Sequence, residues 1–327
     1  MIYTGITYLK GEGFVKNKLI LSILFFMLIS STSICAEKAA SEEAVKEYDG
    51  IWFLGFNLKK DLFGNDDGRV VRQSFAMAIE RGMISSKIIG DDTVPAGVIP
   101  PGMEGYDPTL KGYPYDLGLA KKMMRSVGYQ LNDRRIKNLT ILHTDGKKTL
   151  EIVDRIKMDL VNLGVDMTRT EVSYSDLTKW RKLLASGKYD LFVMGYKAGS
   201  FVELFIGDKD AGVFHTFTCY LNPTDEAKQQ MFDKYEDAVK AGYSPCSVCK
   251  PKLEKTPSTL ALLQPLFHSE GEANFTFYSN KRVDTLIDEI AFADKNKKLA
   301  IYEKLNEIDR AILDDCPVVP LFYITRL

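Results

Sequence analysis

The sequence contains few of the residues and motifs that mark several common classes of protein. Only three histidines occur in 327 residues, which argues against an enzyme built on several histidine metal ligands. Five cysteines are too few for a small fold held together by disulfides. Neither a Gly-Lys-Ser/Thr phosphate-binding loop nor a Gly-x-Ser-x-Gly nucleophile motif occurs. Because no set of nucleophile, base and acid is evident either, the sequence predicts a protein that is not an enzyme.

An excess of positive charge is also missing. Lysine and arginine number 43, and aspartate and glutamate number 44. A protein that binds nucleic acid or an anionic membrane surface needs clustered positive charge, so we expect neither partner. Hydrophobic residues make up 45% of the chain and charged residues 27%, which is typical of globular domains.

The longest apolar run is short and lies near the N-terminus. Residues 19–29 (LILSILFFMLI) follow Lys16 and Lys18 and precede the small residues of 30–36 (SSTSICA). This order is typical of a secretory signal, and the run is shorter than the about 20 residues that a membrane-spanning helix needs. We therefore expect residues 1–36 to be a signal peptide and the mature protein to be periplasmic or extracellular. The alternative is an uncleaved N-terminal anchor, which would be the only attachment to a membrane.

The middle of the chain alternates between two hydrophobic periods. Three apolar runs of strand length are separated by two amphipathic helical patterns. This βαβαβ order predicts parallel strands with right-handed crossovers, and hence an α/β fold. The expected strands span 139–142, 165–172 and 191–194, and the expected helices span 153–163 and 176–185.

Further elements are expected on either side of this unit. Asp66 and Asp67 are expected to cap the first helix, whose apolar face includes Val71 and Phe75. Residues rich in proline, glycine and tyrosine predict an ordered loop rather than a helix at 93–115. The remaining expectations are strands at 52–57 and 318–324, and helices at 116–127, 283–292 and 297–313.

Six segments, in this order, resemble the bacterial extracellular solute-binding proteins of family 5, the peptide- and nickel-binding receptors of ABC importers. The most specific likeness is the loop that runs from Pro-Pro-Gly-Met to Tyr-Pro-Tyr-Asp, at 100–116. The resemblance implies one lobe of a periplasmic-binding-protein type II fold, which closes over a peptide-like ligand and delivers it to a permease. The matching segments are 54–60, 68–84, 95–129, 139–167, 189–196 and 265–290.

Two departures from the family pattern limit what the resemblance implies. The match begins where the second half of such a receptor would begin, so we expect one lobe without the first. The family usually has an Asp-Pro-rich segment that receives the ligand's amino terminus, and here residues 195–207 read GYKAGSFVELFIG. The junction HTDGKK at 143–148 also lacks the arginine that some dipeptide receptors use for the ligand carboxylate. Ligand-binding residues are therefore not assigned.

An insertion at 201–258 carries its own chemistry. It contains His215-x3-Cys219 and, farther along, Cys246-x2-Cys249. Four nitrogen and sulfur ligands in two close pairs are typical of a closed tetrahedral zinc site. The stretch resembles the zinc-binding domain of the Ada DNA-repair proteins, which uses four cysteines, so His215 takes the first position as a variant. The alternatives are a Cys246–Cys249 disulfide and a thiol redox motif.

The insertion is expected to serve the structure. Its acidic residues outnumber its lysines, and it has no arginine, which argues against binding DNA phosphates. A short helix is expected at 233–240, behind the metal-binding turns. A module of this size has too small a core to fold alone without a metal.

The other candidate side chains are expected to be structural. His143 beside Asp145 suggests acid–base work, but we interpret it as a solvated residue at the end of a strand. Three tyrosines could line a ligand surface, although we favour packing of the long loop. The side chains expected to be structural are His268, the buried thiol of Cys316, and Tyr106, Tyr113 and Tyr115.

The expected organisation is a signal peptide at 1–36, a solute-binding lobe at 37–200 and 259–327, and the zinc module between them at 201–258. The leading hypothesis is an exported substrate-binding or accessory protein of a peptide-type ABC importer. Its partners would be a peptide-like ligand and either an ABC permease or a separate first-lobe chain. The alternatives are a protein-interaction scaffold whose zinc module contacts a partner, and a zinc-acquisition or sensing protein with exchangeable metal.

Overall fold

The computed structural model describes residues 46–131, 133–198, 205–215, 219, 221–232, 235–249, 251, 258–294 and 296–326. The expected signal peptide at 1–36 lies outside these residues. Within them, no helix is long and apolar enough to cross a membrane.

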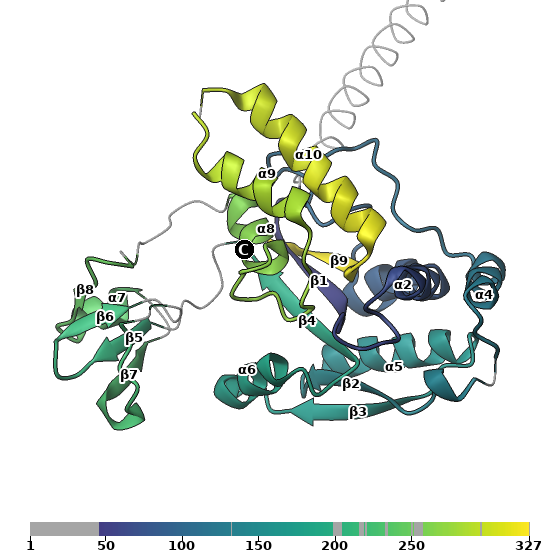
Figure 1. Cartoon of the computed structure of the whole chain (residues 1–327), viewed down its shortest axis with the longest axis horizontal. Helices are drawn as coiled ribbons and strands as arrows, with labels where there is room; N and C mark the ends of the chain where they lie inside the picture. The colour runs from purple at the N-terminus through teal and green to yellow at the C-terminus, as the bar shows by residue number, and fades with distance from the viewer. Residues whose placement is uncertain are drawn as a thin grey trace, which may run out of the picture. The chain divides into compact units, whose positions relative to one another are not determined.

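The larger of the two sheets has five strands in the order β3-β2-β4-β1-β9 (Figure 1). Strand β2 is parallel to both β3 and β4, whereas β1 is antiparallel to both β4 and β9. The predicted parallel arrangement of the middle strands is therefore confirmed. The strands are β1 (Tyr48–Phe56), β2 (Leu139–Thr144), β3 (Met167–Val172), β4 (Leu191–Lys197) and β9 (Val318–Thr325).

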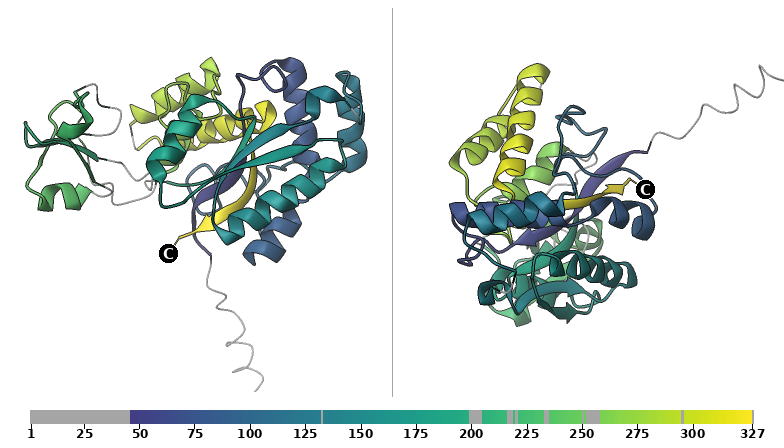
Figure 2. Two further views of the ribbon diagram at one scale, coloured as in Figure 1. Left: turned by 90° about the horizontal axis from the view of Figure 1, so that it is seen from below. Right: turned by 90° about the vertical axis from the view of Figure 1, so that its right-hand side faces the viewer.

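Helices cover both faces of this sheet (Figure 2). The strands alternate their side chains between two hydrophobic clusters, so that Phe53 and Phe192 belong to one and Phe56 and Val193 to the other. One cluster includes apolar residues of α6 (Leu177–Ser186), α8 (Thr259–Phe267), α9 (Lys281–Ala291) and α10 (Lys298–Asp315). The other includes residues of α2 (Asp66–Ala78), α4 (Leu117–Ser126) and α5 (Lys147–Val161). The result is a three-layer α/β core.

Aspartate side chains cap two of the helices. Asp116 and Asp176 cap α4 and α6, where each carboxylate accepts a hydrogen bond from a backbone N–H three residues on. The prediction that Asp66 and Asp67 cap α2 was wrong. The cap is Asn65, whose side chain accepts from the N–H of Gly68, and both aspartates lie in the first turn of the helix. There they still stabilise the positive end of the helix dipole.

Two buried arginines hold irregular segments of the chain in place, and one of them, Arg81, fixes the long loop. Residues 93–115 form neither helix nor strand, as predicted. Arg81, next to the π-helical turn η1 (Ile84–Ile89), donates to the carbonyls of Pro95, Tyr113 and Pro320. Arg72 donates to the carbonyls at three positions: Phe63, Asp315 and Cys316. Desolvation lowers the pKa of both arginines, and these carbonyls supply the partners that their buried donors require.

The smaller sheet has four short strands in the order β7-β5-β6-β8. The only element expected in this part of the chain was a short helix at 233–240. It is confirmed as α7 (Tyr235–Lys240), and residues 233 and 234 lie outside the described residues. The hydrophobic cluster beside this sheet is small, and in the described residues it consists of Phe205, Phe214, Phe232 and Ala238. The strands are β5 (Phe205–Asp208), β6 (Val213–His215), β7 (Gln229–Phe232) and β8 (Ser244–Pro245).

Candidate metal centre

Two parallel strands of the small sheet bring the halves of the His/Cys motif together. His215 is the last residue of β6, and Cys246 directly follows β8. The strands pair with Phe214 opposite Pro245, and the N–H of Cys246 donates to the carbonyl of Phe214 at 2.9 Å. His215 and Cys246 therefore lie at the same end of neighbouring strands, although 30 positions separate them in the sequence numbering.

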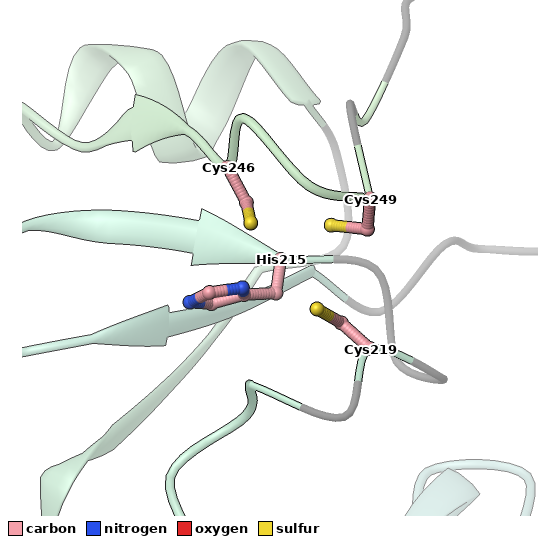
Figure 3. A group of neighbouring side chains, drawn as sticks. All are labelled: His215, Cys219, Cys246 and Cys249. Atoms are coloured by element: carbon pink, nitrogen blue, oxygen red, sulfur yellow. The ribbon is translucent and has the colours of Figure 1, made fainter.

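Cys219 and Cys249 complete a four-residue cluster. One potential ligand atom from each side chain lies within 4.8 Å of the corresponding atoms of the other three. Figure 3 shows the three sulfur atoms and the imidazole of His215 around a common space. His215, Cys219 and Cys246 are buried, and Cys249 is half-buried.

The donor set suits a tetrahedral zinc ion. Zinc bonds of about 2.3 Å to sulfur and about 2.0–2.1 Å to nitrogen place ligand atoms roughly 3.5–3.8 Å apart. The observed upper limit of 4.8 Å needs only a small contraction to reach this spacing. Three thiolates and one imidazole are also the soft and borderline ligands that zinc accepts in structural sites.

The charge state and the burial of His215 suit it to bind a metal ion. Desolvation lowers the pKa of His215, against a weaker opposing effect of Asp208, so the ring is neutral near pH 7. Its Nδ1 atom is buried, and no hydrogen-bond partner lies within reach in the described part of the chain. A buried ring nitrogen without a partner is costly, and a metal ion would supply that partner.

The surroundings of Cys246 favour a thiolate. Desolvation raises the pKa of Cys246, but hydrogen bonds from the backbone of Cys249 and Val248 and from the thiols of Cys249 and Cys219 lower it by more. The N–H of Val248 lies 3.4 Å from Cys246 Sγ. Backbone donors of this kind stabilise the charge of a metal-bound sulfur.

The fourth described cysteine differs from these three. Cys316 is fully buried after α10, as predicted, and burial raises the pKa of its thiol to about 11. No disulfide joins any of the cysteines in the described residues. The described residues therefore contain one inert thiol in the lobe and three thiols gathered with a histidine in the module.

The prediction that His143 is a solvated loop residue was wrong. Strand β2 continues through Thr144, so His143 lies inside the sheet and is fully buried. Its Nδ1 atom lies 2.9 Å from the carbonyl oxygen of Thr144. Asp145 is not paired with the histidine. It accepts hydrogen bonds from the N–H of Tyr174 and the hydroxyl of Ser173, which tie together the loops that follow β2 and β3.

The remaining candidates behave as structural residues, with one exception. His268 Nδ1 accepts from the N–H of Glu270 at 3.1 Å. Tyr113 donates to the carbonyl of Leu313 and Tyr106 packs against the core, so both fix the long loop. Tyr115 is 50% exposed and has no such role.

Two family models match the chain. The model of the bacterial extracellular solute-binding proteins, family 5 (middle part), matches residues 26–204. The model of the metal binding domain of Ada matches residues 198–252, which include all four residues of the cluster.

Peptide-binding proteins are among the similar proteins. Di/tripeptide-binding protein 2 of Pseudomonas aeruginosa (strain UCBPP-PA14) is 23% identical over 177 residues, which are 54% of this chain and 31% of that protein. The murein tripeptide binding protein MppA of Escherichia coli has a TM-score of 0.58 at 16% identity, over 89% of this chain and 46% of that one. DppA of Helicobacter pylori, in complex with the peptide STSA, has a TM-score of 0.59 at 17% identity, over 86% of this chain and 43% of that one.

These comparisons show which fold the chain has and how much of each similar protein it covers. Because the solved structures are less than 25% identical to this chain, they show that the fold is shared and nothing about function. The chain spans less than half the length of the proteins that it matches.

Proposed function

The chain belongs to the bacterial extracellular solute-binding proteins of family 5, and from this premise we propose that it is an exported substrate-binding or accessory protein of a peptide-type ABC importer. The observation that carries the proposal is the family match over residues 26–204, with the three-layer lobe that those residues help to build. The similar proteins named for di- and tripeptides, a murein tripeptide and the peptide STSA make peptides the favoured ligand class.

The proposed domain division follows the separation of hydrophobic clusters. Two clusters lie on the faces of the five-stranded sheet and draw on residues before 199 and after 258. The third cluster draws only on residues between 205 and 243. This supports a lobe at 37–200 and 259–327 with an inserted module at 201–258, after a signal peptide at 1–36.

Within the module, His215, Cys219, Cys246 and Cys249 are proposed to hold one zinc ion. The zinc would join the turn after β6 to the turn after β8, and so replace the hydrophobic core that this part of the chain has too few apolar residues to build. All four ligand positions would be filled by the protein, which is typical of a structural site rather than a catalytic one. The support comes from the cluster geometry, the buried Nδ1 atom of His215 and the family match.

Thermal unfolding in the presence of peptides tests the transport role. Defined di- and tripeptides would be added to the purified protein, with the corresponding free amino acids as the control. A ligand at 100 times its dissociation constant stabilises the folded state by about 2.7 kcal/mol. We expect at least one peptide to raise the melting temperature by several degrees. No shift with any peptide, while the protein remains folded, would contradict substrate binding by this chain alone.

A second candidate function is a protein-interaction scaffold. It is favoured by one observation: the module is inserted directly after β4, where the family usually carries its ligand-binding segment. A scaffold would show no stabilisation by peptides, and the same unfolding experiment therefore separates the two functions.

A further inference from the structure

Strand β3 forms one edge of the five-stranded sheet and pairs only with β2 in the described part of the chain. Figure 2 (left) views the sheet from this edge. The N–H of Leu139 donates to the carbonyl of Asp166, and the N–H of Asp145 to that of Val172. The N–H and C=O of one strand residue point the same way and alternate along the strand. The even-numbered residues therefore face β2, and the odd-numbered ones, Arg169 among them, direct their backbone groups outward.

This edge has few of the features that normally prevent another strand from pairing with it. Its sequence contains no proline, and its register with β2 is regular from Met167 to Val172, without a bulge. The four middle residues, 168–171, are exposed. A regular, exposed edge strand can accept a second strand along its length.

The side chains of β3 are divided between the two faces of the sheet. Met167 belongs to the hydrophobic cluster that includes α5, and Val172 belongs to the cluster that includes α6. Arg169 lies on the same face as Met167, and its Nη1 atom donates a hydrogen bond to Asp154 of α5 at 2.8 Å. Glu171, two residues further on, lies on that face too.

Helix α5 turns an apolar stripe toward this edge. Asp154, Met158 and Val161 are spaced four and three residues apart, so they share one side of the helix. The hydrogen bond that Arg169 donates to Asp154 shows that this is the side near β3. Met158 is 68% exposed and Val161 is 61% exposed, which is unusual for adjacent apolar side chains on a core helix.

We propose that β3 is the docking surface for a second copy of this chain, which pairs with it as an antiparallel strand around a two-fold axis at Thr170. In this register Arg169 lies opposite Glu171 of the second copy, and the opposite charges meet on both sides of the axis. Both residues direct their backbone groups outward, so each such pair exchanges two hydrogen bonds.

Charge selects this register over its neighbours. An axis at residue 169 would place Arg169 opposite its own copy, and an axis at residue 171 would do the same with Glu171, so like charges would face each other. An axis between two residues would place a residue whose backbone groups point outward opposite one whose backbone groups point toward β2. The hydrogen bonds between the two β3 strands could then not form.

The apolar stripe of α5 fits the same partner. A two-fold axis through an antiparallel strand pair is perpendicular to the sheet, so the two α5 helices lie on the same face, one on each side of the axis. Met158 and Val161 of the two copies would then face one another across the axis. The interface would join two five-stranded sheets into one continuous sheet.

Sedimentation equilibrium of the purified protein tests the proposal. We expect the wild type to form a dimer, and Arg169→Glu and Glu171→Arg each to weaken it at least tenfold. The double variant, R169E together with E171R, restores the opposite pairs and should restore the dimer. Arg69→Glu is the matched control, because the side chains of Arg69 and Arg169 are both 42% exposed and each faces one aspartate.

Amide hydrogen exchange supplies an independent readout of the same strand. The N–H groups of Arg169 and Glu171 should gain protection as protein concentration rises, whereas those of Thr168 and Thr170, which face β2, should be protected at every concentration. Melting temperatures would verify that each variant is folded. A wild type that stays monomeric, or a dimer that neither single charge reversal weakens, would overturn the proposal.

Discussion

Asp309 is a carboxylate that the fold holds away from water. It lies on α10, is 1% exposed, and accepts a hydrogen bond from the N–H of Val98 in the long loop at 2.7 Å. Burial raises its pKa from an ordinary value of 3.8 to about 7, although the backbone donors of Val98 and Ile99 oppose the rise. The folded state therefore keeps a proton on Asp309 under conditions in which the unfolded chain has lost it.

The lobe should therefore become less stable as the pH rises from about 4 to about 7. In this range the unfolded chain loses the proton of Asp309, whereas the folded state keeps it. The contribution is on the order of 4 kcal/mol across this window. Asp309→Asn should flatten the dependence of the unfolding free energy on pH, as measured by urea denaturation at several pH values. Asp314→Asn, an exposed aspartate of the same helix, is the control and should leave the dependence as it is. An unchanged profile in Asp309→Asn would contradict this assignment.

The cysteines of the module make a second prediction at the same scale. Cys246→Ser or Cys249→Ser should abolish tight zinc binding, because a hydroxyl replaces a thiolate in a four-ligand site. Cys316→Ala removes a buried thiol of the lobe and should keep the full zinc content. Zinc bound per chain would be measured by elemental analysis after dialysis. Full zinc content in both serine variants would contradict the proposed ligand set.

The four ligands could be predicted from sequence because their chemistry is rare in this chain. They use three of five cysteines and one of three histidines, and their spacing is typical of zinc turns. His143 was misinterpreted because its position depends on where β2 ends, and strand ends depend on pairing with neighbours rather than on local sequence. The β3 edge was not foreseen, since nothing in the sequence says which strand lies outermost.

At the scale of elements, two glycines end helices with the same backbone conformation but in different surroundings. Gly128, after α4, has φ of +82°, and Gly164, after α5, has φ of +83°. A Cβ atom at Gly128 would meet nothing within 4 Å, whereas one at Gly164 would lie 1.7 Å from the carbonyl oxygen of Leu131.

The pair separates backbone strain from steric overlap. Gly128→Ala should cost about 1–2 kcal/mol, the usual penalty of a left-handed conformation for alanine. Gly164→Ala should cost clearly more, because the backbone must move to relieve the overlap with Leu131. Urea unfolding of both variants measures the difference. An equal loss of unfolding free energy in the two variants would show that the chain at Leu131 moves aside without an energetic cost.

Most elements of the lobe agree with the sequence prediction because their hydrophobic periods are long. The helix expected at 297–313 appears as α10 with small shifts of its ends, whereas the one expected at 153–163 appears as α5 and begins earlier, at Lys147. The strands of the module were missed because they have only two to four residues, too few to show an alternation. Helix α8 was missed as well. It is apolar almost throughout and contains Pro265, so it shows little amphipathic period.

At the scale of the whole molecule, lobe and module should respond differently to loss of metal. The lobe has two large hydrophobic clusters of its own, whereas the described residues of the module form one small cluster of four buried side chains. A chelator should therefore unfold the module and leave the lobe folded. Hydrogen exchange should show lost protection at 205–249 with protection retained in α5 and β2. Loss of protection throughout the chain would contradict the independence of the two parts.

The resemblance to family 5 and to the Ada module is confirmed by the family matches, whereas the transport role rests on the unfolding experiment with peptides. The sequence could indicate the family because its segments are extended and keep their order. It could not indicate the ligand, because residues 195–207 depart from the family pattern where the ligand would bind.

The central claim is that a solute-binding lobe carries a structural zinc module, and native mass spectrometry of the purified protein tests it most directly. Spectra would be recorded before and after treatment with a chelator, followed by thiol counting in denaturant. The account predicts one zinc ion per chain, lost on chelation, with the thiols of Cys219, Cys246 and Cys249 then all reactive. A protein without metal, and with Cys246 and Cys249 joined in a disulfide, would contradict it.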